Sequence, residues 1–388
     1  MEYIQRINEL TIERSLRDYP VVALTGPRQC GKSTLVKHLL NHMSDYLYLD
    51  LERPSDLQKL DDPEWFFLSR KERLICIDEV QRKPDLFPVI RSLCDQWNRN
   101  GAFLILGSAS RDLLQQSSES LAGRIGYNPL TPFLWKEVKE RVSLTDYLYK
   151  GGFPRSLIEA RDANVSLEWR ENFIATFLER DLLQWRGFTP QIMRRLWQML
   201  AYVNGQTVNY SSLGNSLGVS SSTVSNYIDL LSETYMLVVI PPYFSNMGKR
   251  LVKAPKVYVS DSGITTALLQ IHSFEEMMGH PSLGAIWEQV VLTNLMGHFP
   301  KAQLFFYRTS NGTEMDFVMK YKNKVFAIEC KCSLAPVLQK GFYNAIEDIS
   351  PTYTFIVIPT EQKGWSMKPQ IDVVSLTELV EGIELKSV

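Results

Sequence analysis

The chain has 388 residues, 45% of them hydrophobic, and its 42 Lys and Arg against 43 Asp and Glu leave a net charge of −1. This length and composition exclude a disordered chain and predict about two or three globular domains. The balanced charge excludes a uniformly basic surface, so any surface that binds nucleic acid has to be local.

The apolar segments and the cysteines of the sequence indicate the cellular compartment in which we expect the protein. No window approaches the roughly 18 uninterrupted apolar residues of a membrane span, and the first residues lack the basic-then-apolar order of a secretory signal. The five cysteines are an odd, scattered set that fits reduced thiols. Cys330 and Cys332 are too close together for a usual zinc pair and have no second pair. We expect a cytoplasmic protein with no structural metal at these cysteines.

A glycine-rich segment between a predicted strand and a predicted helix is the strongest signal. Residues 19–25 are apolar and partly β-branched, and residues 32–40 carry apolar side chains at helical spacing. The segment between them fits Gly-x-x-x-x-Gly-Lys-[Ser/Thr], in which backbone N–H groups and the helix start bind phosphate. The predicted nucleotide-binding residues are Gly26, Pro27, Arg28, Gln29, Cys30, Gly31, Lys32, Ser33 and Thr34. A glycine turn that matches by chance is the alternative, so a second element is needed.

Acidic residues after a second apolar run supply that element. Residues 74–77 predict a buried parallel strand, and Asp78 and Glu79 follow at its carboxyl end, where open α/β sheets bind ligands. Lys32 would contact the β- and γ-phosphates of ATP, while Ser33 and Asp78 would hold Mg²⁺. Glu79 would orient or deprotonate the attacking water.

Four further positions are candidates for completing the ATP site. A strand over residues 102–106 ends just before Ser108, a candidate sensor of the γ-phosphate. Arg124 lies among small residues from which a guanidinium could reach a phosphate, and a surface ion pair is the alternative. Arg111 and Arg180 are weaker candidates for the same role.

The order of elements predicts the architecture. A further strand over residues 47–51 completes a parallel sheet with crossover helices in residues 3–135, followed by an amphipathic helical segment over 146–187. Three helices and a two-stranded wing then predict a helix-turn-helix of the winged type, over residues 191–202, 210–217, 221–234, 236–240 and 256–259.

The charges of this winged helix leave its partner open. Its third helix has no Lys or Arg, which argues against base-specific contacts, whereas the wing offers four basic residues for phosphate contacts: Lys249, Arg250, Lys253 and Lys256. Docking to a protein and binding to DNA are equally compatible with this pattern.

Charged residues near the C-terminus suggest a second site. Strands are predicted over residues 304–308, 314–319 and 324–331, and alternation places Glu329 and Lys331 on one face beside Asp316. Asp316 and Glu329, with Glu288 from a preceding helix, would bind Mg²⁺ or Mn²⁺, and Lys331 would position the attacking water. A surface ion pair is the alternative for Glu329 and Lys331.

Together these motifs resemble the prokaryotic AAA-type (AAA_14) ATPases that carry a C-terminal DUF4143 domain. The resemblance implies an α/β multidomain protein with an AAA+-like P-loop NTPase parallel sheet, a winged helix and an end domain similar to PD-(D/E)XK nucleases. Met315 stands where the nuclease motif often has proline. The implied domains are a P-loop ATPase core over 1–145, a helical connector over 146–187, a winged helix over 188–265 and the nuclease-like DUF4143 domain over 266–388.

The expected function is ATP hydrolysis with Mg²⁺ that controls the winged-helix and nuclease-like module, acting on double-stranded DNA. The alternative is a STAND-like switch in which ATP governs association with a protein partner and the C-terminal domain is not catalytic. Oligomeric state stays open, since Arg124 could act in its own subunit or in a neighbour's.

Overall fold

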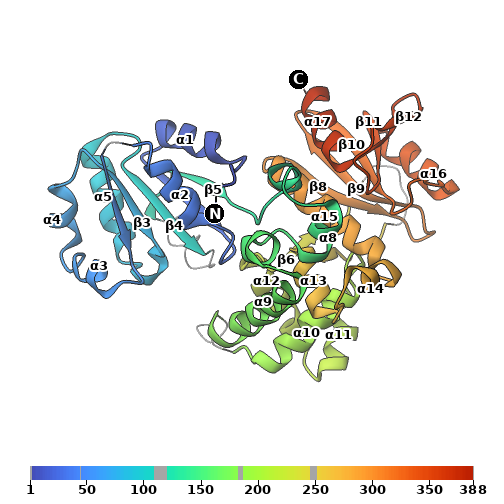
Figure 1. The fold of residues 1–388 in the computed structure, drawn as a ribbon, viewed down its shortest axis with the longest axis horizontal. Helices are drawn as coiled ribbons and strands as arrows, with labels where there is room; N and C mark the ends of the chain where they lie inside the picture. Colours follow the sequence, from blue (N-terminus) through green and yellow to red (C-terminus); the bar gives the residue numbers. More distant parts are fainter. Residues whose placement is uncertain (1, 44, 109–119, 182–186, 245–250, 388) are drawn as a thin grey trace. The chain divides into compact units, whose positions relative to one another are not determined.

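The computed structural model describes the whole chain apart from residues 1, 44, 109–119, 182–186, 245–250 and 388 (Figure 1). Arg111, Lys249 and Arg250 lie outside the described residues. The chain forms two compact units, Met1–Phe133 with Glu233–Tyr235, and Leu134–Ser232 with Met236–Val388. Among the described residues, no helix combines the length and apolar character that crossing a membrane requires.

The first unit is built on five strands in the order β2-β3-β4-β1-β5, and every neighbouring pair is parallel. The predicted parallel sheet core is therefore confirmed. Its helices and strands are α1 (Glu9–Asp18), β1 (Val21–Gly26), α2 (Lys32–Leu40), β2 (Tyr46–Asp50), α3 (Pro54–Gln58), α4 (Pro63–Leu68), β3 (Leu74–Asp78), α5 (Leu86–Trp97), β4 (Phe103–Ser108) and β5 (Ile125–Pro129).

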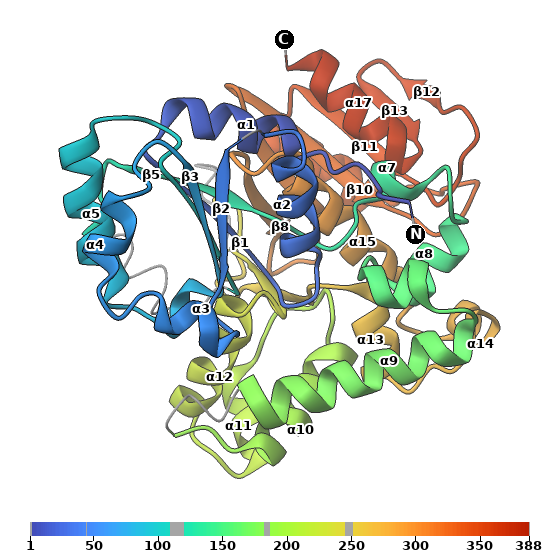
Figure 2. The ribbon, with the colours of Figure 1, turned by 60° about the vertical axis from the view of Figure 1, so that its left-hand side comes forward.

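Helices cover both faces of this sheet, with α4 and α5 on one side and α2 on the other (Figure 2). The central strands β1 and β3 are therefore buried along their whole length, which explains their unbroken apolar runs. Phe67 of α4 packs edge-to-face on Phe103 of β4, with ring centroids 5.5 Å apart. Because every strand of this sheet runs in the same direction, their carboxyl ends lie along one edge.

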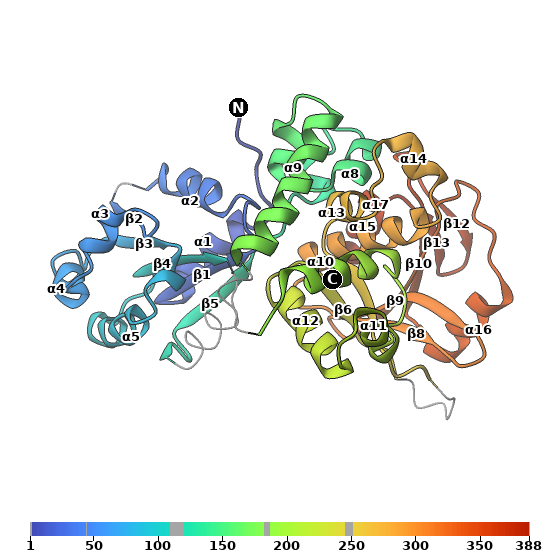
Figure 3. The same cartoon turned by 90° about the horizontal axis from the view of Figure 1, so that it is seen from below.

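The second unit combines a helical part with a six-stranded sheet. Its helices and strands are α7 (Trp135–Val138), α8 (Leu144–Lys150), α9 (Ala163–Thr176), α10 (Pro190–Tyr202), α11 (Tyr210–Leu217), α12 (Ser221–Glu233), β6 (Leu237–Ile240), β7 (Lys256–Val259), α13 (Ser262–Leu268), α14 (Phe274–Gly279), α15 (Leu283–His298), β8 (Gln303–Arg308), β9 (Glu314–Tyr321), β10 (Lys324–Cys330), α16 (Lys340–Ile349), β11 (Tyr353–Val357), β12 (Trp365–Lys368), β13 (Ile371–Val374) and α17 (Leu376–Lys386). Figure 3 shows α10, α11 and α12 grouped beside β6.

The six-stranded sheet has the order β12-β13-β11-β10-β9-β8 and mixes antiparallel with parallel pairs. Phe342 and Ala345 of α16 share a buried cluster with Ala327 of β10 and Ile356 of β11. Phe355, the neighbour of Ile356 on β11, has its ring on the opposite face of the sheet, where the Lys386 ammonium of α17 lies over it. The sheet is thus covered by helices on both faces.

A ribbon of two antiparallel strands, β6 and β7, joins the helical part to this sheet. Lys256 at the start of β7 also pairs with Thr207, which lies between α10 and α11. Beyond β6 the backbone continues onto β8: the Tyr243 N–H donates to the Phe306 carbonyl at 2.7 Å, and the Val252 N–H donates to the Arg308 carbonyl at 3.1 Å. The ribbon is therefore anchored along the edge strand β8.

Gly26 is required by the close approach of β5. A Cβ at this position would lie 2.1 Å from the Leu130 carbonyl oxygen. We predict that Gly26→Ala lowers the free energy of unfolding of the first unit by about 2 kcal/mol or more, because backbone atoms must move. Gly123→Ala is the control, since its φ is also positive but no atom lies within 4 Å of its Cβ, and it should cost only about 1 kcal/mol. Equal losses in urea unfolding would contradict the steric explanation.

Candidate functional site

The glycine-rich loop connects β1 to α2 at the carboxyl edge of the first sheet. Gly31 precedes α2 in the left-handed region, with φ 101° and ψ 17°, and Gln29 also has a positive φ of 60°. Such a path turns successive N–H groups inward, which creates an anion-binding concavity at a helix start. The Lys32 ammonium lies across this loop and donates to the carbonyls of Gly26 at 3.0 Å and Pro27 at 2.8 Å.

The Asp78 carboxylate lies beside the start of α2. Its Oδ2 accepts a hydrogen bond from the Ser33 hydroxyl at 2.7 Å and another from the Tyr48 hydroxyl on β2. Burial and the contact with Asp78 raise the pKa of Tyr48, so the hydroxyl stays protonated and donates. A carboxylate and a hydroxyl oxygen this close together are the ligand types that Mg²⁺ prefers, so the residues fit the predicted metal.

Glu79 follows directly in the left-handed region, with φ 56°. Its N–H donates to Asp78 Oδ1 at 3.0 Å, and its carboxylate accepts from the Gln81 amide. Burial raises the pKa of Glu79, and the nearby Lys32 ammonium partly opposes this. A half-buried carboxylate of raised proton affinity next to the phosphate loop is suited to accept a proton from water.

Ser108 and Arg124, the remaining candidates in this unit, lie at opposite ends of the parallel strands. The Ser108 backbone ends β4, between β1 and β3, in register with Gly26, so it lies at the phosphate-loop edge. Arg124 precedes β5, and its carbonyl accepts from the N–H of Val21 at the amino end of β1. Its guanidinium makes two hydrogen bonds to Asp95, at 2.6 and 3.0 Å. Arg124 is therefore not brought to the phosphate loop of its own unit, because parallel strands keep their two ends apart.

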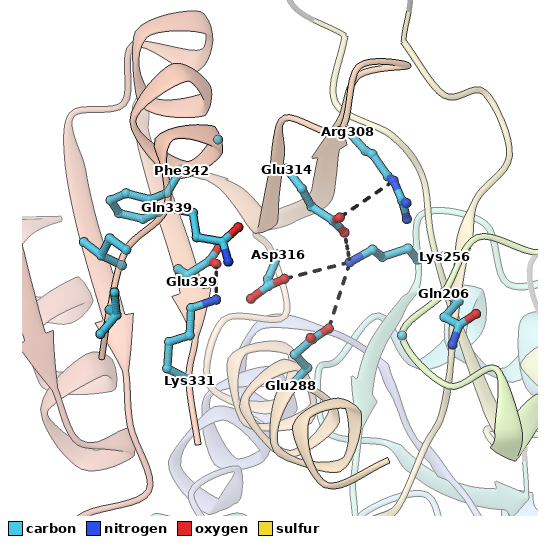
Figure 4. A pocket seen from close by; sticks show the side chains of 15 residues that line it. Gln206, Lys256, Glu288, Arg308, Glu314, Asp316, Glu329, Lys331, Gln339 and Phe342 are labelled. Atoms are coloured by element: carbon cyan, nitrogen blue, oxygen red, sulfur yellow. Dashed lines mark hydrogen bonds and ion pairs between the residues drawn. The ribbon is translucent and has the colours of Figure 1, made fainter. Parts of the chain in front are cut away.

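In the second unit, the predicted acidic residues surround one cavity of about 430 Å³. Glu288 comes from α15, Asp316 from β9 and Glu329 from β10, while Lys331 follows β10 (Figure 4). The Lys331 ammonium donates to Glu329 Oε1 at 2.6 Å, and the N–H of Cys330 donates to Asp316 Oδ2 at 2.8 Å. The structure thus brings together all four predicted residues.

Lys256 occupies the middle of this cavity, contrary to the prediction that it contacts phosphate groups from an exposed wing. Its side chain is only 2% exposed, and its Nζ lies 2.8 Å from Glu314 Oε1 and 3.9 Å from both Glu288 Oε2 and Asp316 Oδ1 (Figure 4). The prediction was wrong because Lys256 is buried against these carboxylates, in a ribbon whose flanking residues Pro242 and Leu251 pair with Phe306 and Thr309.

The charges in the cavity shift one another's proton affinities. Desolvation raises the pKa of Glu288 to about 8 and that of Glu329 to about 8, and the charge of Asp316 acts in the same direction on both. Burial alone lowers the pKa of Lys256, but the carboxylates of Glu288, Asp316 and Glu314 hold it above its ordinary value. Within the described part of the chain, no three His, Cys, Asp or Glu side chains converge as a ready metal site.

Sequence reasoning missed two residues of these sites, Tyr48 and Glu314, and the role of a third, Lys256. Tyr48 lies two positions before Asp50 at the end of β2 and Glu314 two positions before Asp316, so a search of alternate strand positions could have found both. The role of Lys256 has no local signal, because it depends on long-range pairing: Pro242 and Leu251, which flank the ribbon, pair with Phe306 and Thr309 much later in the chain.

Comparisons with known proteins find three family matches along the chain and several similar proteins. The AAA domain family matches residues 18–139, a domain of unknown function (DUF8612) matches 141–275, and a second (DUF4143) matches 283–379. Uncharacterized protein Rv2008c of Mycobacterium tuberculosis is 38% identical over 91% of this chain and 79% of its own length. MJ1637 of Methanocaldococcus jannaschii is 25% identical over 70% of this chain and 66% of its own. The solved Walker-type ATPase of Pyrococcus abyssi aligns with 69% of this chain and 96% of its own, at 17% identity and a TM-score of 0.48.

The phosphate loop, the acidic strand end and the parallel strand order define the first unit as a P-loop NTPase of the AAA type. The chain belongs to the family of the mycobacterial protein Rv2008c, as an AAA-type ATPase with a C-terminal DUF4143 domain.

Substitutions of Lys32 and Arg124 should affect ATP differently, because the two residues lie at opposite ends of the strands of the first sheet. We predict that Lys32→Ala lowers ATP turnover by about two orders of magnitude or more, because phosphate charge is left uncompensated. Arg124→Ala should leave ATP binding by a dilute, single subunit within about twofold, since its guanidinium pairs with Asp95. Isothermal titration with ATP and a phosphate-release assay measure both. A loss of ATP binding in Arg124→Ala at low protein concentration would contradict the placement.

The acidic cavity should make its strands less stable as pH rises. The pKa values of Glu288 and Glu329 are raised in the folded protein, to about 8, from an ordinary 4.5. Between pH 4.5 and about pH 8 the folded state therefore binds more protons than the unfolded state. As the pH rises through this range, the free energy of opening β9 and β10 should fall by on the order of a few kcal/mol. Amide hydrogen exchange, corrected for its intrinsic pH dependence, measures this. Glu329→Gln should flatten the slope, and a rise in stability over the same range would contradict the burial effect.

Proposed function

We propose that ATP hydrolysis in the first unit controls a winged-helix and nuclease-like module that cleaves DNA. The observation that carries the proposal is the cavity in which Asp316, Glu329 and Lys331 meet within a protein that also has an ATP site. The domain division proposed for this function is the one given by the sequence, with the ATPase core over 1–145, the connector over 146–187, the winged helix over 188–265 and the nuclease-like domain over 266–388.

The residues of the ATP site have distinct tasks in this proposal. Lys32 would exchange its bonds to the loop carbonyls for bonds to the β- and γ-phosphates. Ser33 and Asp78 would hold Mg²⁺, whose charge would neutralise the phosphates. Glu79 would take a proton from the attacking water, and Gln81 would hold the Glu79 carboxylate in place. Ser108 lies at the same edge for contact with the γ-phosphate.

The element order of the second unit supports both of its proposed modules. Helix α10, the bridge at Thr207, helices α11 and α12, and the ribbon follow one another in this order, as in a winged helix. Helix α15, the antiparallel strands β8 to β10, helix α16 and the parallel strand β11 follow one another as expected of a nuclease-like domain. Asp316 and Glu329 lie on adjacent strands of it.

In the nuclease-like site, the acidic residues and Lys331 divide the work. The carboxylates of Asp316 and Glu329 have oxygen ligands suited to Mg²⁺ or Mn²⁺, which would polarise a phosphodiester. Lys331 donates to Glu329 and lies at the cavity, where its ammonium could position a water molecule against the phosphorus. Glu288 adds a further carboxylate from α15.

A second candidate is favoured by the contacts of Lys256. An ammonium already lies among three of the carboxylates, and the exposed positions of α12 include Ser222, Asn226 and Asp229. These observations support an ATP-dependent switch that binds a protein partner and whose C-terminal domain does not catalyse.

Matched variants distinguish the two functions. We predict that purified protein nicks supercoiled DNA with Mn²⁺ and ATP, and that Asp316→Asn reduces nicking by about two orders of magnitude while ATP turnover is unchanged. Lys32→Ala should abolish ATP turnover. Asp372→Asn is the control, because this carboxylate on β13 pairs with Lys386 and Ser366 and does not line the cavity. Nicking that survives Asp316→Asn would remove the nuclease assignment, and absence of nicking in the unsubstituted protein would favour the switch.

A further inference from the structure

Lys256 is the most deeply buried cation of the acidic cavity. Its residue is 1% exposed, and its ammonium lies 2.8 Å from Glu314 and 3.9 Å from Glu288 and Asp316. The ring of Phe306 lies on another side, 5.6 Å from the Nζ. An ammonium in this position compensates carboxylates that are otherwise expensive to bury together. A mobile cation at the position of this ammonium would compensate the carboxylates in the same way.

The cavity nevertheless keeps an excess of acidic groups. Four carboxyl groups line it, those of Glu288, Glu314, Asp316 and Glu329, against the ammonium groups of Lys256 and Lys331 and the Arg308 guanidinium at its rim, which lies 3.7 Å from Glu314. Glu329 is 8% exposed, and its Oε2 is a buried oxygen with no hydrogen-bond partner in the structure. A buried acceptor without a donor next to a cavity is a position at which a cation would be bound.

We propose that Lys256 is a built-in cation that keeps a divalent cation out of this cavity, and that its withdrawal opens a divalent site made by Asp316, Glu329 and Glu288. This deepens the proposed nuclease-like function by naming what controls its metal. Because two cations within a few ångströms of each other repel, Lys256 and a divalent ion compete for the same carboxylates.

The position of Lys256 ties this competition to the ribbon. Its backbone pairs with Ile240 on one side and Thr207 on the other, so the residue moves with the ribbon as a unit. The ribbon in turn holds β8 through the backbone bonds of Tyr243 and Val252. Displacement of the ribbon from β8 would therefore carry Lys256 away from the carboxylates and leave the cavity open to a metal ion.

Binding of Mn²⁺ to the full chain, measured by electron paramagnetic resonance without nucleotide, tests the proposal. The Asp78→Asn background removes the carboxylate that would bind metal at the ATP site and is used throughout. Lys256→Met retains the length of the side chain without its charge, and we expect one additional Mn²⁺ with affinity about tenfold or more above that of the Asp78→Asn parent. Glu329→Gln added to Lys256→Met should remove this gain.

Two control variants isolate the charge and the position. Lys253→Met removes an exposed lysine three residues earlier and should leave Mn²⁺ binding unchanged. Lys256→Arg keeps a positive charge in the cavity and should also show no gain. Equal Mn²⁺ affinity in Lys256→Met and its parent, or equal gains in Lys253→Met and Lys256→Met, would overturn the proposal.

Folding and nuclease activity are read separately. If Lys256→Met is unfolded without metal, the proposal requires that Mn²⁺ restore its circular dichroism, and that the same holds for Lys256→Gln; failure of Mn²⁺ to restore either would overturn it. DNA nicking is measured with Mn²⁺ and ATP in Lys256→Met made in the chain with an intact ATP site. A gain in Mn²⁺ binding without nicking would support the cation exchange while rejecting the nuclease function.

Discussion

The buried contact between Lys256 and three carboxylates is the constraint on which the second unit depends. Glu288 comes from α15 and Glu314 and Asp316 come from β9, and such a group of acids is stable inside a protein only with a counter-charge. The chain supplies that charge from the ribbon between its helical part and its sheet. One ammonium thereby joins three segments that are far apart in the sequence.

The two sites share a physical principle, because each holds its acidic residues with donors from the protein itself. At the ATP site, Ser33 and Tyr48 donate to one oxygen of Asp78. In the cavity, the Cys330 N–H donates to Asp316. The sites differ in the group that contacts the carboxylate. The neutral hydroxyl groups of Ser33 and Tyr48 can share Asp78 with a metal ion, whereas the Lys256 ammonium repels a metal ion and has to leave Asp316 first.

How far the sequence could predict these sites depended on whether their members belong to consecutive elements. The phosphate loop, Asp78 and Glu79 follow strands whose apolar runs are unmistakable, and the parallel sheet then necessarily brings their ends together. Asp316, Glu329 and Lys331 were found in the same way from neighbouring strands. Arg124 was predicted to be near the phosphates because its neighbours in the sequence are small. Its actual position at the amino end of β5 follows from the direction of that strand. Lys256 was expected in solvent, because local charge patterns do not contain the pairing of the ribbon with β8.

The backbone bonds between the ribbon and β8 have a consequence for self-association. Strand β8 is at the end of its sheet, and an edge strand with free N–H and carbonyl groups is a template onto which another chain can add. Pro241, Tyr243 and Val252 occupy part of that template at Phe306 and Arg308. The ribbon thus protects the protein against edge-to-edge aggregation, and any state in which it detaches exposes a surface able to recruit a second strand.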